Sequence, residues 1–93
     1  MRIQHMVGND VVLEDYGKIE LSWIVPALNR QRYYRISVEP GLFGPVLARS
    51  WGRMEWKRLR EKEQFFAEGK LVDALSTANL LLKKKLSKGY CYL

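Results

Sequence analysis

The stretch ARSWGRMEW, residues 48–56, combines side-chain types that can contact a nucleic acid. In an extended strand successive side chains point to opposite faces, so one face carries Leu47, Arg49, Trp51 and Arg53. An arginine bonds a phosphate through two N–H groups, and an indole ring stacks on a base or a sugar. The same residues allow a purely structural interpretation, in which Arg49 and Arg53 stack on Trp51 as cation–π neighbours. The spacing alone is compatible with both.

The other face of this strand carries small side chains. Ala48, Ser50 and Gly52 alternate there with the residues just described. Small side chains permit one element to pack closely on another, so we expect this face to lie beneath a helix. The Trp51 face then stays free to contact a partner.

A second candidate group lies in WKRLREKEQFF, residues 56–66, which we expect to form the next strand. One face of that strand carries Trp56, Arg58, Arg60 and Lys62, and the other carries Lys57, Leu59, Glu61 and Glu63. The cations fit a surface that faces an anion. A solvated edge strand that uses charge against aggregation explains the cations but not the tryptophan. Glu61 and Glu63 share a face as paired catalytic carboxylates do, but solvated strand charges are far commoner.

Catalytic and metal-binding patterns are absent from the sequence. His5 is the sole histidine and Cys91 the sole cysteine, and neither has a partner at metal-ligand spacing. The same scarcity argues against a nucleophile–histidine triad, and GLFGP lacks the lysine and the following helix of a phosphate-binding loop. A lone cysteine forms no internal disulfide and implies no oxidising compartment. We therefore predict a protein that is not an enzyme and has no cofactor and no metal.

The net charge of +6 is concentrated in the second half of the chain. Residues 1–45 hold five basic and five acidic side chains, whereas residues 46–93 hold eleven basic and five acidic ones. Such asymmetry indicates an anionic partner, most commonly a nucleic acid. The longest strictly apolar run, LLL, is far shorter than the roughly 20 residues of a membrane helix, and the N-terminal residues lack the apolar core of a signal peptide. We expect a cytoplasmic protein without membrane association.

The hydrophobic pattern predicts the strands that position these residues. Residues 18–25 and 32–39 alternate apolar and polar side chains, as half-buried strands do. The loop 40–45, with two glycines and two prolines, leads into the strand 46–54, and the strand 56–66 follows. Adjacent strands joined by short turns form an antiparallel sheet.

A helix is predicted after Gly69. Leu71, Leu75, Ala78, Leu82 and Leu86 recur there at helical spacing, and Gly89 follows as a stop. Lysines near the end either complement the helix dipole or extend the basic surface: Lys83, Lys84, Lys85 and Lys88. We predict an α+β domain over residues 18–93, an antiparallel β-sheet of about four strands with one C-terminal α-helix packed across it. Residues 1–17 are an N-terminal extension, floppy or loosely docked.

The order of these features resembles the WGR domain family. The matching parts are the pair Tyr33–Tyr34, LFG in the loop, Trp51-Gly52-Arg53, the helical stripe and the ending KLSKGY. The resemblance covers about residues 18–92 and implies an antiparallel sheet with a helix across it. The family occurs in poly(ADP-ribose) polymerases, where it binds DNA near a strand end, and in small bacterial proteins. Family members commonly continue the motif with a glycine-bearing turn, whereas MEWKR follows here.

The resemblance also implies roles for the motif residues. Trp51 stacks against a sugar or base, Arg53 contacts a phosphate or a partner protein, and Gly52 lets the backbone approach closely. We therefore predict a non-catalytic nucleic-acid-binding module, for DNA more than RNA. The candidate binding residues are Arg49, Trp51, Gly52, Arg53, Trp56, Arg58 and Arg60. The alternatives are a protein-interaction domain with a Trp/Arg hot spot, and a structural domain with a buried Trp51.

Overall fold

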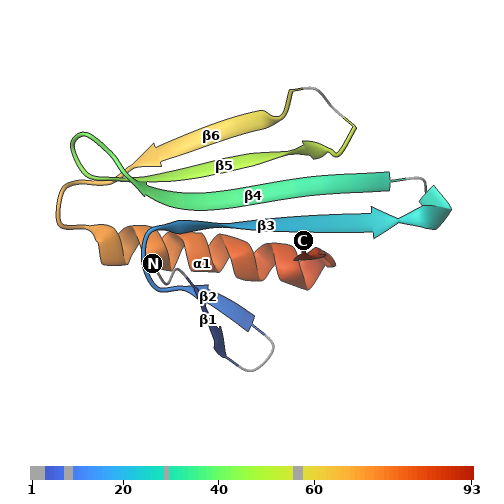
Figure 1. Ribbon diagram of the computed structural model, residues 1–93, viewed down its shortest axis with the longest axis horizontal. Coiled ribbons are helices and arrows are strands. Elements are labelled where there is room, and N and C mark those ends of the chain that lie inside the picture. Colours follow the sequence, from blue (N-terminus) through green and yellow to red (C-terminus); the bar gives the residue numbers. More distant parts are fainter. Residues whose placement is uncertain (1–3, 8–9, 29, 56–57) are drawn as a thin grey trace.

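The computed structural model describes residues 4–7, 10–28, 30–55 and 58–93 of the chain. Its elements are β1 (Gln4–Val7), β2 (Asp10–Leu13), β3 (Gly17–Val25), the 3₁₀ turn η1 (Pro26–Leu28), β4 (Arg30–Pro40), β5 (Pro45–Arg53), β6 (Arg60–Phe65), α1 (Leu71–Lys88) and β7 (Cys91–Tyr92). β1 and β2 form a hairpin, and the other strands form one sheet in the order β6-β5-β4-β3-β7. Figure 1 shows α1 along the β3 side of this sheet, with the hairpin beyond the helix. The predicted α+β architecture is confirmed.

The long strands of the sheet are neighbours in sequence as well as in space. Each pairs antiparallel with the next, so that Ile36 of β4 lies opposite Ile19 of β3 and Arg49 of β5. The short strand β7 was not predicted. It adds a fifth strand by placing Cys91 opposite Ser22 of β3.

The helix α1 follows the predicted stripe and ends at the predicted glycine. Gly89 has a φ of 121°, a conformation that glycine adopts readily, and its N–H donates to the Leu86 carbonyl at 3.2 Å. A side chain at this position would also place its Cβ 3.2 Å from the Trp23 indole nitrogen. The backbone conformation therefore favours glycine where the helix ends, and a side chain there would also have to displace the Trp23 ring slightly.

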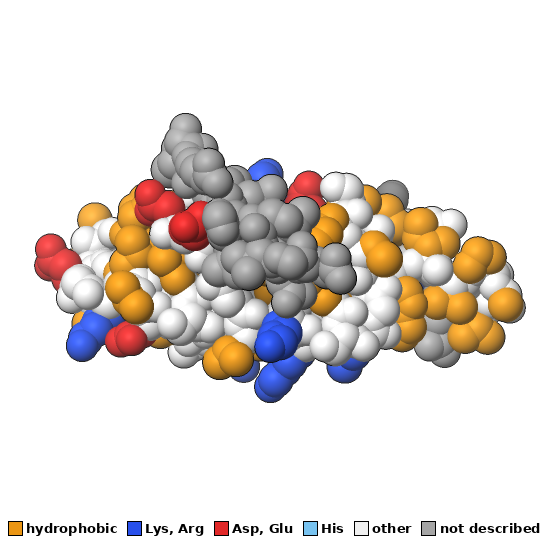
Figure 2. Space-filling view, turned by 90° about the horizontal axis from the view of Figure 1, so that it is seen from below, with side chains coloured by type: hydrophobic (Ala, Val, Ile, Leu, Met, Phe, Trp, Pro, Cys, Tyr) orange, Lys and Arg blue, Asp and Glu red, His pale blue; other side chains and the backbone are white. Residues whose placement is uncertain are grey.

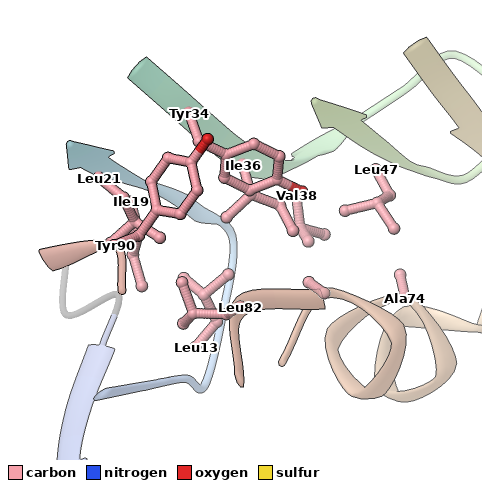
Figure 3. Close-up of a cluster of buried hydrophobic side chains, with 11 residues drawn as sticks. Leu13, Ile19, Leu21, Tyr34, Ile36, Val38, Leu47, Ala74, Leu82 and Tyr90 are labelled. Atoms are coloured by element: carbon pink, nitrogen blue, oxygen red, sulfur yellow. The ribbon is translucent and has the colours of Figure 1, made fainter. Parts of the chain in front are cut away.

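The hydrophobic core lies between α1 and one face of the sheet. Figure 3 shows the core side chains of β3, β4 and β5 pointing toward the helix. The buried apolar side chains are Leu13, Ile19, Leu21, Tyr34, Ile36, Val38, Leu47, Ala74, Ala78, Leu82 and Tyr90. Burying apolar side chains stabilises the folded state in proportion to the area removed from water. This cluster is therefore the main source of stability of the fold.

The packed face of β5 is the opposite of the one expected. Leu47 is 1% exposed and belongs to the core, so the prediction that Ala48, Ser50 and Gly52 lie beneath the helix is wrong. The antiparallel register explains the outcome, since Leu47 lies opposite the buried Val38 of β4 and continues its apolar row. Burying that row removes more apolar area from water than burying the small side chains.

The segment before the sheet also contacts the helix. Leu13, at the end of β2, is 2% exposed within the core cluster. Its backbone N–H donates to Asn79 Oδ1 at 2.8 Å, and Asn79 Nδ2 donates to its carbonyl at 3.1 Å. These two hydrogen bonds attach the end of the predicted N-terminal extension to α1.

The edge strand β6 is shorter than predicted, because it begins at Arg60. Arg58 therefore precedes the strand rather than alternating along it, and Trp56 lies outside the described residues. Within the described ranges, α1 included, no helix combines the length and hydropathy needed to cross a membrane.

Candidate nucleic-acid interface

The register of β4, β5 and β6 gathers cations on the helix side of the sheet. Trp51 lies opposite Tyr34 on one side and Arg60 on the other. The next row on the same face places Arg49 opposite Lys62, and the row at the strand end places Arg53 opposite Arg32. We call the set the basic face: Arg32, Arg49, Trp51, Arg53, Arg60, Lys62 and, from α1, Lys85.

Trp51 is half-buried at the edge of the core. Its side chain packs against the core cluster, and the Arg49 guanidinium carbon lies 5.7 Å from the ring centroid. The predicted cation–π contact therefore exists for Arg49. Arg53 is exposed and forms an ion pair with Glu55, in which the Arg53 Nη1 lies 3.8 Å from the Glu55 Oε1. A surface ion pair of this kind contributes little, so Arg53 remains able to exchange Glu55 for another anion.

Lys85 links the helix to the aromatic residues beneath the basic face. Its Nζ lies 4.8 Å from the Tyr34 ring centroid and 5.5 Å from that of Tyr90. Burial lowers the pKa of Lys85, and three neighbouring cations lower it further: Lys88, Arg49 and Arg32. The effect of these three cations on its pKa indicates that Lys85 lies close to each of them.

The Tyr34 hydroxyl is buried beside these cations. Among the described residues its oxygen has no hydrogen-bond partner. Burial raises the pKa of Tyr34, and the nearby Arg49 guanidinium opposes that rise. A buried polar group without a partner costs about 1–3 kcal/mol. The centre of the basic face thus carries positive charge and a buried hydroxyl close to the Arg49 guanidinium.

The structure brings four of the predicted site residues onto one face: Arg49, Trp51, Arg53 and Arg60. Gly52 is buried and lies on the opposite side of β5, beside Tyr33 of β4. Arg58 is exposed but precedes β6, and Trp56 lies outside the described part of the chain.

Three cations of the basic face, Arg32, Lys62 and Lys85, were absent from the predicted binding set, although the sequence carried a signal for each. Lys62 alternates with Arg60 along the same strand and therefore shares its face. Arg32 lies two residues before Tyr34 in β4 and therefore on the same side of the strand. Lys85 lies three residues after the buried Leu82, on the stripe that α1 turns toward the sheet.

The opposite face of the sheet, which we call the open face, carries carboxylates. Alternation along β6 places Glu61 opposite Ser50 and Glu63 opposite Ala48. In the neighbouring strands the Tyr33 hydroxyl donates to Glu20 Oε1 at 2.6 Å, and Arg35 Nη2 donates to Ser50 Oγ at 3.2 Å. Burial, then the hydrogen bond and the charge of Glu20, raise the pKa of Tyr33 to about 12.

Comparison with known proteins agrees with this geometry. Residues 16–92 match the WGR domain family, and because this region is most of the chain, the protein belongs to that family. The chain is also 32% identical over 83 residues to the uncharacterized protein y4dW of Sinorhizobium fredii (strain NBRC 101917 / NGR234). The aligned region covers 88% of this chain and 39% of that protein, so the chain spans about two fifths of this relative's length. No solved structure matches.

Proposed function

We propose that this WGR domain is a non-catalytic module that binds DNA through the basic face. The observation that supports the proposal is the separation of charge by the sheet. Arg60 and Lys62 lie on the Trp51 side of β6, while Glu61 and Glu63 lie on the other. A surface of one sign attracts a polyanion from solution, and contacts to phosphates then dominate its affinity.

The half-buried Trp51 supplies the second part of the proposed contact. Its packing against the core holds the ring in place, so ordering it on a ligand costs little entropy. Its remaining surface lies beside Arg49 and Arg60, which can bond phosphates on either side of a stacked sugar or base. Family membership favours DNA as the nucleic acid, as the resemblance to the polymerase domains implied.

Fluorescence anisotropy with blunt, nicked and single-stranded DNA over a series of salt concentrations tests this function. We expect log K on duplex DNA to fall with log salt at about 0.9 per phosphate contacted. The double variant Trp51→Ala, Arg53→Ala should bind weakly. Arg35→Ala, an arginine on the open face, is the matched control and should bind as the unchanged protein does.

Two results would overturn the proposal. One is the absence of binding at low salt, and the other is unchanged binding by the Trp51 and Arg53 double variant. If a protein co-purifies and DNA affinity shows little salt dependence, the basic face instead contacts a protein through its Trp and Arg side chains.

A further inference from the structure

We infer that a pocket at the start of α1 docks a protein segment in which apolar side chains are flanked by lysine or arginine. The pocket is a cavity of about 310 Å³ between the β4–β5 loop and the residues that lead into α1. Its lining includes Tyr16, Pro40, Leu42, Phe43, Glu68 and Leu71. It lies at the opposite end of β5 from Arg53, about 26 Å away at roughly 3.3 Å per residue.

The rim of this pocket presents apolar side chains to solvent. Leu42 is 89% exposed and Phe43 is 83% exposed, more than any other large hydrophobic side chain of the described residues. Val72, which follows the lining residue Leu71 at the start of α1, is 73% exposed. Clustered exposed apolar side chains, unlike scattered ones, mark contact sites between proteins.

The loop that carries Leu42 and Phe43 is held in one shape. The Gly41 N–H donates to the Gly44 carbonyl at 2.9 Å, and a Cβ at Gly41 would lie 2.5 Å from that oxygen. Gly44 has a φ of +147°, and a Cβ there would lie 2.2 Å from the Phe66 carbonyl oxygen. The backbone is therefore locked against the segment before α1. A preformed loop binds a partner at a smaller entropic cost than a mobile one.

Charge identifies the kind of partner. Along the sequence, the residues that line the pocket and their neighbours up to two positions away include five acidic and two basic side chains. They are Glu14, Asp15, Glu39, Glu68 and Asp73, and Lys18 and Lys70. This end is therefore acidic in a chain whose net charge is +6. Figure 2 shows acidic side chains beside the apolar ones at this end, the left of the view, where Figure 1 places the β4–β5 loop and the start of α1.

Glu68 in the lining and the acidic excess at this end of the chain's fold repel phosphate and attract cations. The pocket therefore fits neither DNA nor an anionic lipid surface. Apolar side chains of a protein segment would fill the cavity, while a flanking lysine or arginine side chain would meet Glu68. The inference does not depend on the proposed function, because the two surfaces share no residue.

Peptide titration followed by NMR amide shifts tests the inference on the full chain. The probe is the peptide KKLFKK, with EELFEE and KKSSKK as matched controls for charge and for apolar content. We expect KKLFKK to shift the amide signals of Gly41, Gly44 and Gly69, and neither control to do so. Glu68→Lys should weaken KKLFKK binding roughly threefold to fivefold, the value of one exposed ion pair.

Variants locate the contact. Phe43→Ser should abolish the KKLFKK shifts, whereas Leu80→Ser, a substitution of a helix residue that is 63% exposed and does not line the pocket, should leave them unchanged. The Trp51 and Arg53 double variant should bind the peptide normally even if it has lost DNA binding. Equal binding of KKLFKK and EELFEE, shifts confined to the basic face, or no shift at millimolar peptide would overturn the inference. So would shifts of the same glycines with protein concentration alone, because the occupant would then be a second copy.

Discussion

The basic face and the open face of the sheet consist of the same strands but differ in charge and in packing. On the helix side the ends of β4, β5 and β6 carry arginine and lysine around Trp51, and the middle of the face is buried by α1. On the open side Glu61 and Glu63 flank small residues that no helix covers. Strand alternation alone separates the cations of β6 from its carboxylates. A shift of β6 by one residue would move Arg60 and Lys62 to the open face and Glu61 and Glu63 to the helix side. Register is therefore as important to the proposed function as composition.

The largest expected effect concerns which face of β5 is packed. Leu47→Ala removes a side chain that is 1% exposed and leaves a cavity against α1, so we expect the free energy of unfolding to fall by about 2–5 kcal/mol. Val46→Ala, one residue away on the half-buried open side, should cost less than about 1.5 kcal/mol. Urea unfolding followed by circular dichroism measures both. Equal losses would contradict the assignment of the faces.

A smaller effect is expected on DNA affinity. Arg49→Gln with Lys62→Gln removes two cations that lie opposite each other, and should lower the slope of log K against log salt by about 1.8 if each contacts one phosphate. Glu61→Gln with Glu63→Gln removes the same number of charges from the open face and should leave the slope unchanged. Anisotropy titrations at several salt concentrations compare the pairs. An unchanged slope for the cation pair, or a large gain in affinity for the glutamate pair, would instead place DNA on the open face.

The smallest expected effect is a pH dependence of folding stability that arises from Tyr33 on the open face. Folding raises the pKa of Tyr33 from 10.0 to about 12, so its contribution to stability is complete below pH 10 and is lost as the pH rises toward 12. In Tyr33→Phe this loss should disappear, and stability should decline less steeply over that range. Tyrosinate absorbance and urea unfolding as functions of pH measure the effect. An unchanged decline in the variant would assign it to Tyr34 and Tyr90, whose pKa values are also raised.

Sequence reasoning predicted the elements well because their periodicity is strong. The alternation in β3, β4 and β5 and the leucine stripe of α1 each extend over enough residues to define a period. Strand β7 has two residues, too few to show any alternation. It forms because Gly89 ends the helix and Tyr90 enters the core, which directs the next residues along β3.

The orientation of β5 was predicted wrongly because one strand was considered without its neighbours. The small size of Ala48 and Ser50 suggested close packing, but the decisive information is that Leu47 lies opposite Val38. The same comparison across strands would have placed Arg32 beside Arg53. Contacts between strands depend on register, which local patterns do not specify.

The place of α1 after strands β3 to β6 in the sequence has a consequence for synthesis. The strands from β3 to β6 leave the ribosome in the order in which they pair, so a nascent sheet can assemble before the helix exists. Until α1 arrives, Ile36, Val38 and Leu47 form an uncovered apolar surface on that sheet. The arginines at the end of the same surface give nascent chains a like charge, which opposes their aggregation.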